Sequence, residues 1–259
     1  LYSALTTLPA LESISLGSLG VTQPHGSPLA KHESLTELLR VPSLRCVRFH
    51  RFSFTPARCQ AAANALTKAT AITKLNFSEC SFPVEESATI LANSLKLNTS
   101  VRSIKVEGPR DEVIHNVLAT ALPSNSALQE LSFLSLFGPI DNDAIWSPIF
   151  SALGKNTALK SLQVDVSGMD ESLCTAIKDW IGTNATLHHL ELNHVCMYDN
   201  TAALWSISFL STDQGLKFLM IDATESFVDT LRSDIIRMLQ DYASFESFFD
   251  PRLGQHQSR

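Results

Sequence analysis

The sequence predicts an α/β solenoid of stacked strand–helix units, and three observations support this fold class. A short motif, Leu-x-x-Leu-x-Leu with apolar variants, recurs nine times at a period near 28 residues. Apolar residues alternate within the motif, as they do in a short strand that buries one face. About ten residues later the apolar spacing changes to three and four, as in an amphipathic helix. One such unit repeated at a fixed period is typical of a solenoid.

The motifs define nine expected strands. Their first apolar residues are Leu11, Leu44, Ile72, Val101, Leu128, Leu159, Leu187, Leu216 and, in a degenerate copy, Phe245. A strand that buries one face points every second side chain into the core. We therefore expect interior positions for the leucines at the second apolar place of four motifs, namely Leu75, Leu131, Leu162 and Leu190.

A helix is expected between each motif and the next. In residues 86–98, for example, Ile90, Leu91, Ser94 and Leu95 share one helical face. Residues suited to a helix start stand at the expected positions, namely Thr55-Pro56, Asp111, Asp143, Asp170 and Asp229. In the unit that begins at Leu128, Pro148 interrupts the helical pattern, so we expect that helix to start late, at Ser147.

An asparagine stands three residues before the first apolar place of four units, at Asn98, Asn125, Asn156 and Asn184. Asparagine tolerates the left-handed backbone that ends many helices, and its side chain can bond nearby backbone groups. We therefore expect each of these residues to end a helix and begin the tight turn into the next strand.

The motif and its period resemble those of the leucine-rich repeat family, in the long-repeat form typified by ribonuclease inhibitor. The resemblance covers Leu1 to about Phe249. It implies a right-handed solenoid, or horseshoe, with parallel strands inside the curve and helices outside. It also implies an asparagine or cysteine three residues after the third apolar place, and this is clear only at Cys80.

The organisation expected is one solenoid of about eight to nine repeats over residues 1–249, followed by a polar tail over residues 250–259. Residues 1–11 align on residues 118–128, which places Leu1 in the last turn of a convex helix. We therefore expect the solenoid to be truncated at its N-terminus.

Composition disfavours several classes of protein. A net charge of −6 and a pI near 5.7 argue against non-specific nucleic-acid binding. No apolar run approaches the ~18 residues that span a bilayer, so no membrane role is expected. Five cysteines without a CxxC pair disfavour a disulfide framework or a zinc ribbon, and favour a reducing, cytoplasmic compartment.

The polar places of the predicted strands face the concave surface, where this family usually binds partners. From residue 45 to residue 105, every charge at the second, third or fifth place of a motif is positive: Arg45, Arg48, Lys74, Arg102 and Lys105. Strands ~4.8 Å apart would bring these five cations within roughly 10–15 Å. Such a cluster on an acidic protein favours a protein partner with an acidic segment. The alternative is a solvated sheet face, partly screened by Glu79 and Glu107.

Two further groups of residues have weaker functional interpretations. Phe218, Met220 and Phe249 would form an apolar concave patch, which marks an interface or is covered by the tail or a further unit. In residues 188–195, His189 and Glu191 share a strand face. Zinc usually needs three or four convergent ligands, so we expect polar concave residues there, and neither a metal nor a cofactor.

The sequence has no Gly-rich phosphate loop, no G-x-S-x-G, no H-E-x-x-H and no paired carboxylates at fixed spacing. We therefore expect a non-enzymatic module that binds a protein partner. The resemblance implies settings such as substrate adaptors of ubiquitin ligases and recognition halves of innate-immune receptors. The alternative is a regulator of a small GTPase, like the Ran GTPase-activating proteins, which share the long repeats but typically carry an acidic stretch after them.

Overall fold

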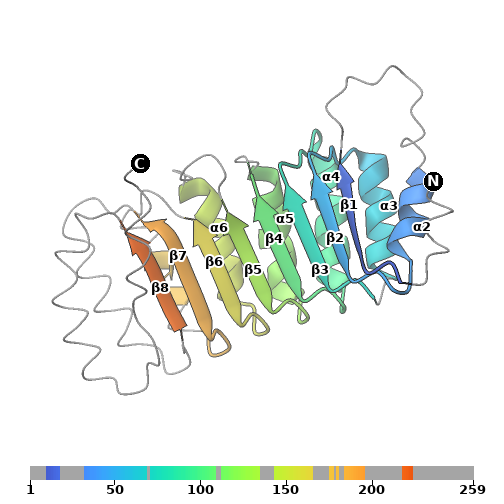
Figure 1. Cartoon of the computed structure of the whole chain (residues 1–259). Coiled ribbons are helices and arrows are strands. Elements are labelled where there is room, and N and C mark those ends of the chain that lie inside the picture. The colour runs from blue at the N-terminus through green and yellow to red at the C-terminus, as the bar shows by residue number, and fades with distance from the viewer. Residues whose placement is uncertain are drawn as a thin grey trace, which may run out of the picture.

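Parallel strands form a single open sheet in the computed structural model of the chain (Figure 1). The strands are β1 (Ser13–Gly17), β2 (Cys46–His50), β3 (Lys74–Ser78), β4 (Ser103–Glu107), β5 (Glu130–Leu134), β6 (Ser161–Asp165), β7 (His189–Val195) and β8 (Phe218–Ala223). Their order in the sheet is their order in the chain. The structure describes residues 10–17, 32–68, 71–108, 112–134, 143–165, 175–177, 179–180, 184–195 and 218–223. The expected strand at Phe245 lies outside these residues.

Helices cover one face of the sheet, and each packs against the next (Figure 1). They are α2 (His32–Leu39), α3 (Pro56–Leu66), α4 (Glu85–Leu97), α5 (Glu112–Ala121), which a 3-10 turn follows, and α6 (Asp143–Leu153). In Figure 1 the strands point upward, the helices lie behind them, and each following strand lies to the left. This makes the crossovers right-handed. The predicted fold class, a right-handed solenoid of the leucine-rich repeat type, is confirmed.

The register keeps each motif place in line across the sheet. Leu75 pairs with Val47 on one side and with Ile104 on the other, and Leu131 continues the same row. The leucines expected inside are buried, with 2 % exposure for Leu75 and Leu131 and none for Leu162 and Leu190. Equivalent residues of successive repeats therefore stack on one another, and the repeats share one continuous hydrophobic core.

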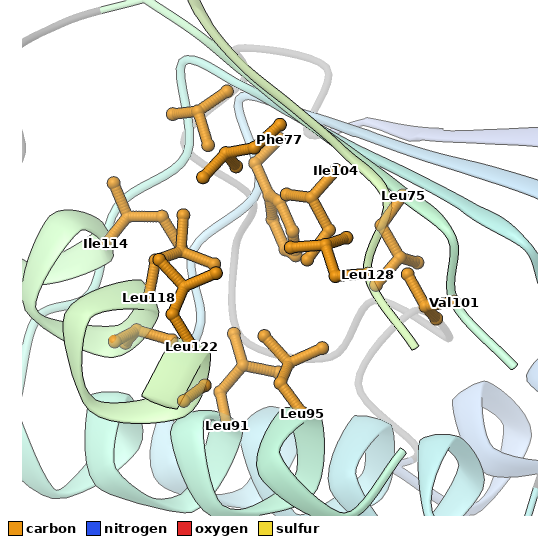
Figure 2. Packing of buried hydrophobic residues seen from close by; sticks show 14 of the residues in the cluster. Leu75, Phe77, Leu91, Leu95, Val101, Ile104, Ile114, Leu118, Leu122 and Leu128 are labelled. Carbon is orange, nitrogen blue, oxygen red and sulfur yellow. The ribbon is translucent and has the colours of Figure 1, made fainter. Parts of the chain in front are cut away.

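The core fills the space between the sheet and the helices. Figure 2 shows Leu75 and Ile104 from neighbouring strands facing Leu91 and Leu95 of α4 and Leu118 of α5. Each of these five side chains is at most 3 % exposed. Burial of one such side chain stabilises the folded state by about 1.5–3 kcal/mol. These residues belong to one core that joins strands and helices of several repeats.

Helix starts agree with the predicted signals where the structure describes them. Thr55 precedes α3, which has Pro56 in its first turn, and α6 begins at Asp143. Proline suits a first turn because the N–H that it lacks would have no partner in the helix there. Asp111, Asp170 and Asp229 lie outside the described residues.

Pro148 lies inside α6, so the expectation of a late start at Ser147 is wrong. A proline within a helix forfeits a backbone hydrogen bond and costs about 3 kcal/mol. Trp146, Ile149 and Phe150 on the same helix are at most 1 % exposed. Their burial offsets the cost, and the helix continues through the proline.

Buried asparagines connect the repeats at the turn between helix and strand. Asn156 shows the pattern: its Oδ1 accepts hydrogen bonds from the N–H groups of Ala158 and Leu159, at 2.9 and 2.8 Å. Its Nδ2 donates to the carbonyls of Leu122 and Asn125 in the preceding repeat, at 2.7 and 2.8 Å. One amide thus shapes its own turn and ties it to the turn before.

The same contacts recur along the chain, and we call the set the asparagine ladder; its members are Asn98, Asn125, Asn156 and Asn184. The backbone of Asn98 (φ −74°, ψ 132°) and Asn125 (φ −83°, ψ 116°) is extended. The expected left-handed conformation is therefore wrong, whereas the expected bonding to nearby backbone is confirmed. These places need asparagine because its amide both donates and accepts.

Replacing Leu131 by alanine removes a side chain from the shared core and leaves a cavity. We expect Leu131→Ala to lower the free energy of unfolding by about 2–5 kcal/mol. Urea denaturation followed by circular dichroism measures this. A loss below about 0.5 kcal/mol would contradict the packing described here.

Replacing Asn156 by alanine leaves two turn N–H groups and two carbonyls without their buried partner. Each such loss costs about 1–3 kcal/mol, so we expect Asn156→Ala to destabilise the fold by at least about 2 kcal/mol. Asn116→Ala is the matched control, because Asn116 is exposed on α5 and alanine favours helix. Equal effects of the two substitutions in urea denaturation would rule out the ladder as a stabilising element.

Candidate functional site

The face of the sheet away from the helices carries the candidate site, and we call it the open face. On β2, Val47 and Phe49 are buried against the helices, so Cys46, Arg48 and His50 point to the open face. The third, fifth and seventh places of the other motifs do the same. The resemblance to leucine-rich repeats predicts that the open face is the concave surface of the solenoid.

Arg48, Asn76 and Lys105 stand side by side on the open face, because they occupy the fifth place on β2, β3 and β4. Lys74 occupies the third place on β3, two residues before Asn76. Arg48 and Lys74 are exposed, and Lys105 is half-buried. Three of the five predicted cations therefore share one patch on three neighbouring strands, which spans two strand spacings, or ~10 Å.

The other two predicted cations lie at the edge of the sheet where the strands begin. Arg45 and Arg102 each precede a strand by one residue. The Arg45 Nη1 donates to the carbonyl of Ala71 at 3.2 Å, and the Arg102 Nη1 donates to that of Ala127 at 3.0 Å. Both carbonyls belong to the turn of the following repeat, so these two guanidinium groups bridge repeats beside the patch.

Of the two carboxylates that the alternative interpretation expected to screen the patch, Glu107 contacts Lys105, whereas Glu79 pairs with Arg51, which lies outside the patch. Glu107 Oε1 lies 2.6 Å from Lys105 Nζ, and Glu79 Oε2 lies 2.8 Å from Arg51 Nε. Sequence reasoning missed Arg51, because it stands at the eighth place of its motif, beyond the strand. Arg51 and Glu79 have left-handed backbone, with φ of 49° and 51°, which turns the chain away from the sheet at equivalent points of two repeats.

Glu107 is the electrostatic centre of the patch. Burial opposes its ionisation, but the hydrogen bond and charge of Lys105, the amide of Asn76 and the charge of Arg48 outweigh burial and lower its pKa. The Asn76 Nδ2 donates to Glu107 Oε2 at 3.3 Å. One carboxylate thus lies among three groups that attract anions.

The side chains of Arg48 and Lys74 make no ion pair or hydrogen bond with the residues that the structure describes. Lys105, by contrast, has Glu107 as its partner. The patch therefore carries three cations against one carboxylate, and two exposed cations are left to attract a ligand. A carboxylate or phosphate group is the natural counterpart of such a pair.

The next part of the open face satisfies its own polar groups. Ser132 donates to Gln163 at 2.8 Å, Gln163 donates to Glu191 at 2.6 Å, and His189 Nε2 lies 3.7 Å from Glu191 Oε2. Across the described ranges, no three His, Cys, Asp or Glu side chains are placed to hold a metal ion. The side chain of His194 lies outside the description.

The second predicted patch is placed by backbone only. Phe218 and Met220 are in register with His189 and Glu191 on the neighbouring strand. Their side chains, and the whole of Phe249, lie outside the described residues. None of the described helices is both long enough and apolar enough to span a membrane.

Comparison with known proteins finds only weak similarities. No protein-family model and no curated protein matches the chain. Among solved structures it is similar to leiomodin-1 actin-binding site 2, with 15 % identity over 82 % of this chain and 98 % of that chain, at TM-score 0.41. It is similar to a chain of the Rad7–Elc1 complex from yeast, with 17 % identity, coverage of 76 % and 47 %, and TM-score 0.46. It is also similar to the C-terminal domain of Caenorhabditis elegans tropomodulin, with 15 % identity, coverage of 58 % and 93 %, and TM-score 0.41. At such scores, the fold assignment rests on this chain's own strand register and helix packing.

The Glu107 carboxyl should titrate below the usual glutamate pKa of 4.5. A carboxyl with a lowered folded-state pKa stabilises the fold above its unfolded pKa, and this contribution is lost as pH falls through the folded value. Carbon-13 NMR of the side-chain carboxyl gives the pKa. Lys105→Met should raise it, and Lys155→Met, in an exposed turn, should not; an unshifted pKa in Lys105→Met would disprove the pairing.

Proposed function

We propose that this chain is a non-enzymatic module that holds a protein partner on its open face. An acidic segment of the partner lies against Arg48, Lys74 and Lys105, with Arg45 and Arg102 at the neighbouring edge of the sheet. The observation that carries the proposal is the pair of exposed, unpaired cations, Arg48 and Lys74, on an otherwise acidic protein. The repeats are assigned to the long ribonuclease-inhibitor-like type because of their period near 28 residues. The cysteine pattern of the sequence supports a cytoplasmic location.

The sheet supports this function because it holds the cations in place. Parallel strands fix the Cα positions of Arg48 and Lys74, and the core behind them resists deformation. A preorganised surface loses less conformational entropy on binding than a mobile one. The local positive field also draws an acidic segment toward one end of a molecule whose net charge of −6 repels it elsewhere.

An adaptor of a ubiquitin ligase and a recognition part of an innate-immune receptor are the settings in which such a module would work. In either setting, catalysis or signalling belongs to other parts of the assembly. The open face then supplies selectivity, because exposed charges mainly set association rate and partner choice.

Selection of random peptides displayed on phage tests this function. Peptides selected on the wild-type chain should be rich in Asp and Glu, and their binding should weaken as salt rises from 0.1 to 1 M, because the screening length falls from ~10 to ~3 Å. The double substitution Arg48→Glu with Lys74→Glu should weaken binding at least tenfold.

The control for this selection is Lys155→Glu with Lys160→Glu, which makes the same change of net charge at two exposed lysines outside the patch. It should change binding less than twofold. Selection of neutral, apolar peptides whose binding ignores Arg48 and Lys74 would contradict the proposed function and would direct attention to Phe218 and Met220.

A further inference from the structure

Asn76 differs from every member of the asparagine ladder, although it is buried like them. Its exposed fraction is 9 %, and its Oδ1 is shielded from solvent and has no hydrogen-bond partner among the residues that the structure describes. The ladder amides use both their oxygen and their nitrogen. A buried acceptor without a donor costs about 1–3 kcal/mol, so the unused oxygen of Asn76 requires an explanation.

The orientation of the Asn76 amide follows from its other contact. Its Nδ2 donates to the Glu107 carboxylate, which accepts only, so the nitrogen must face β4. The Oδ1 then lies on the other side of the amide. Arg48 and Lys105 flank Asn76 in register, and neither donates to this oxygen.

The open face therefore offers two kinds of group at one place. Arg48 and Lys74 are exposed cations that an anion would neutralise, and the neighbouring Asn76 oxygen, which is shielded from solvent, lacks an N–H or O–H donor among the described residues. A carboxylate alone satisfies only the cations, whereas an acidic residue in an extended peptide supplies a carboxylate and a backbone N–H together.

We propose that Arg48, Lys74 and Asn76 form a binding site for one Asp or Glu of an extended peptide segment. The side-chain carboxylate binds Arg48 and Lys74, and the side chains that cover Asn76 Oδ1 move aside, so that a backbone N–H of the same segment donates to this oxygen. This assignment rests on the proposed function and specifies the chemistry of the partner that the open face holds.

Glu107 has a defined part in this site. Its carboxylate already interacts with Lys105, Asn76 and, through charge, Arg48. It is an internal competitor of the ligand carboxylate, because it neutralises one cation and repels an incoming anion. Removing its charge should therefore strengthen the binding of an acidic peptide, the opposite of the effect of removing Arg48.

Fluorescence anisotropy with fluorescein-labelled hexaglutamate at 50 mM salt tests these effects. Arg48→Gln should weaken binding at least fivefold, and Glu107→Gln should strengthen it at least threefold. Glu86→Gln is the matched control for the second substitution, because Glu86 is an exposed carboxylate on α4, on the other side of the sheet. It should change binding less than twofold.

A double-mutant cycle isolates the contact with Asn76. Hexaglutamate methylated on its backbone nitrogens should bind the wild-type chain 3- to 10-fold more weakly than unmethylated hexaglutamate, the range expected for one net hydrogen bond. It should bind Asn76→Ala no more weakly than the unmethylated peptide does. Circular dichroism checks that Asn76→Ala is folded; if it is not, Asn76→Ser takes its place in the cycle.

The outcomes separate this inference from the proposed function. Loss of binding in Arg48→Gln with equal effects of methylation on wild type and Asn76→Ala would overturn the Asn76 site and leave the acidic-partner function standing. No binding of hexaglutamate to the wild-type chain would overturn both. Full competition by inorganic phosphate at the same charge concentration would show a simple anion site and would also overturn the inference.

Discussion

The hydrogen bonds of the asparagine ladder are the constraint on which the regular stacking depends. Tight turns between helix and strand bury backbone N–H and C=O groups that the sheet and helices do not satisfy, and each group needs a partner. Asn156 supplies four such bonds, two within its own turn and two to the turn before. Because one side chain serves both turns, neighbouring repeats are held in a single register.

That register converts sequence periodicity into rows of side chains. Residues near 28 positions apart become neighbours, so the fifth places of successive strands form one line across the open face, from Arg48 to Glu191. Part of this line is internally bonded, through Gln163. In the other part, Lys105 pairs with Glu107, whereas the Arg48 side chain has no ion pair and Asn76 Oδ1 has no hydrogen-bond donor among the described residues. The same sheet thus carries one polar region whose side chains bond to one another and a second region whose polar groups are available to a ligand.

Buried asparagine amides differ in how completely their hydrogen bonds are satisfied within the chain. Every rung of the ladder uses both the oxygen and the nitrogen of its amide within the chain, as stability requires. Asn76 does not, and it lies beside the two unpaired cations rather than in a turn. Glu107 reduces the repulsion among the cations of the patch, because its carboxylate pairs with Lys105 and also interacts with the charge of Arg48. Asparagine therefore serves stability where it stands in the turn of a repeat, and we propose that it serves binding where it stands on a strand, at Asn76.

In the repeats that the structure describes, the sequence by itself determined the strands, the row register and the buried leucines, because alternation within each motif and a nearly constant period suffice to define them. It also identified Glu107 as a screening charge of the patch. Only the tertiary structure decided that Arg45 and Arg102 bond to turns instead of sharing the patch, that Arg51 pairs with Glu79, and that α6 continues through Pro148. Each of these depends on atoms of an adjacent repeat or on packing against the core. Such contacts arise only once stacking has brought distant residues together, so no local pattern records them.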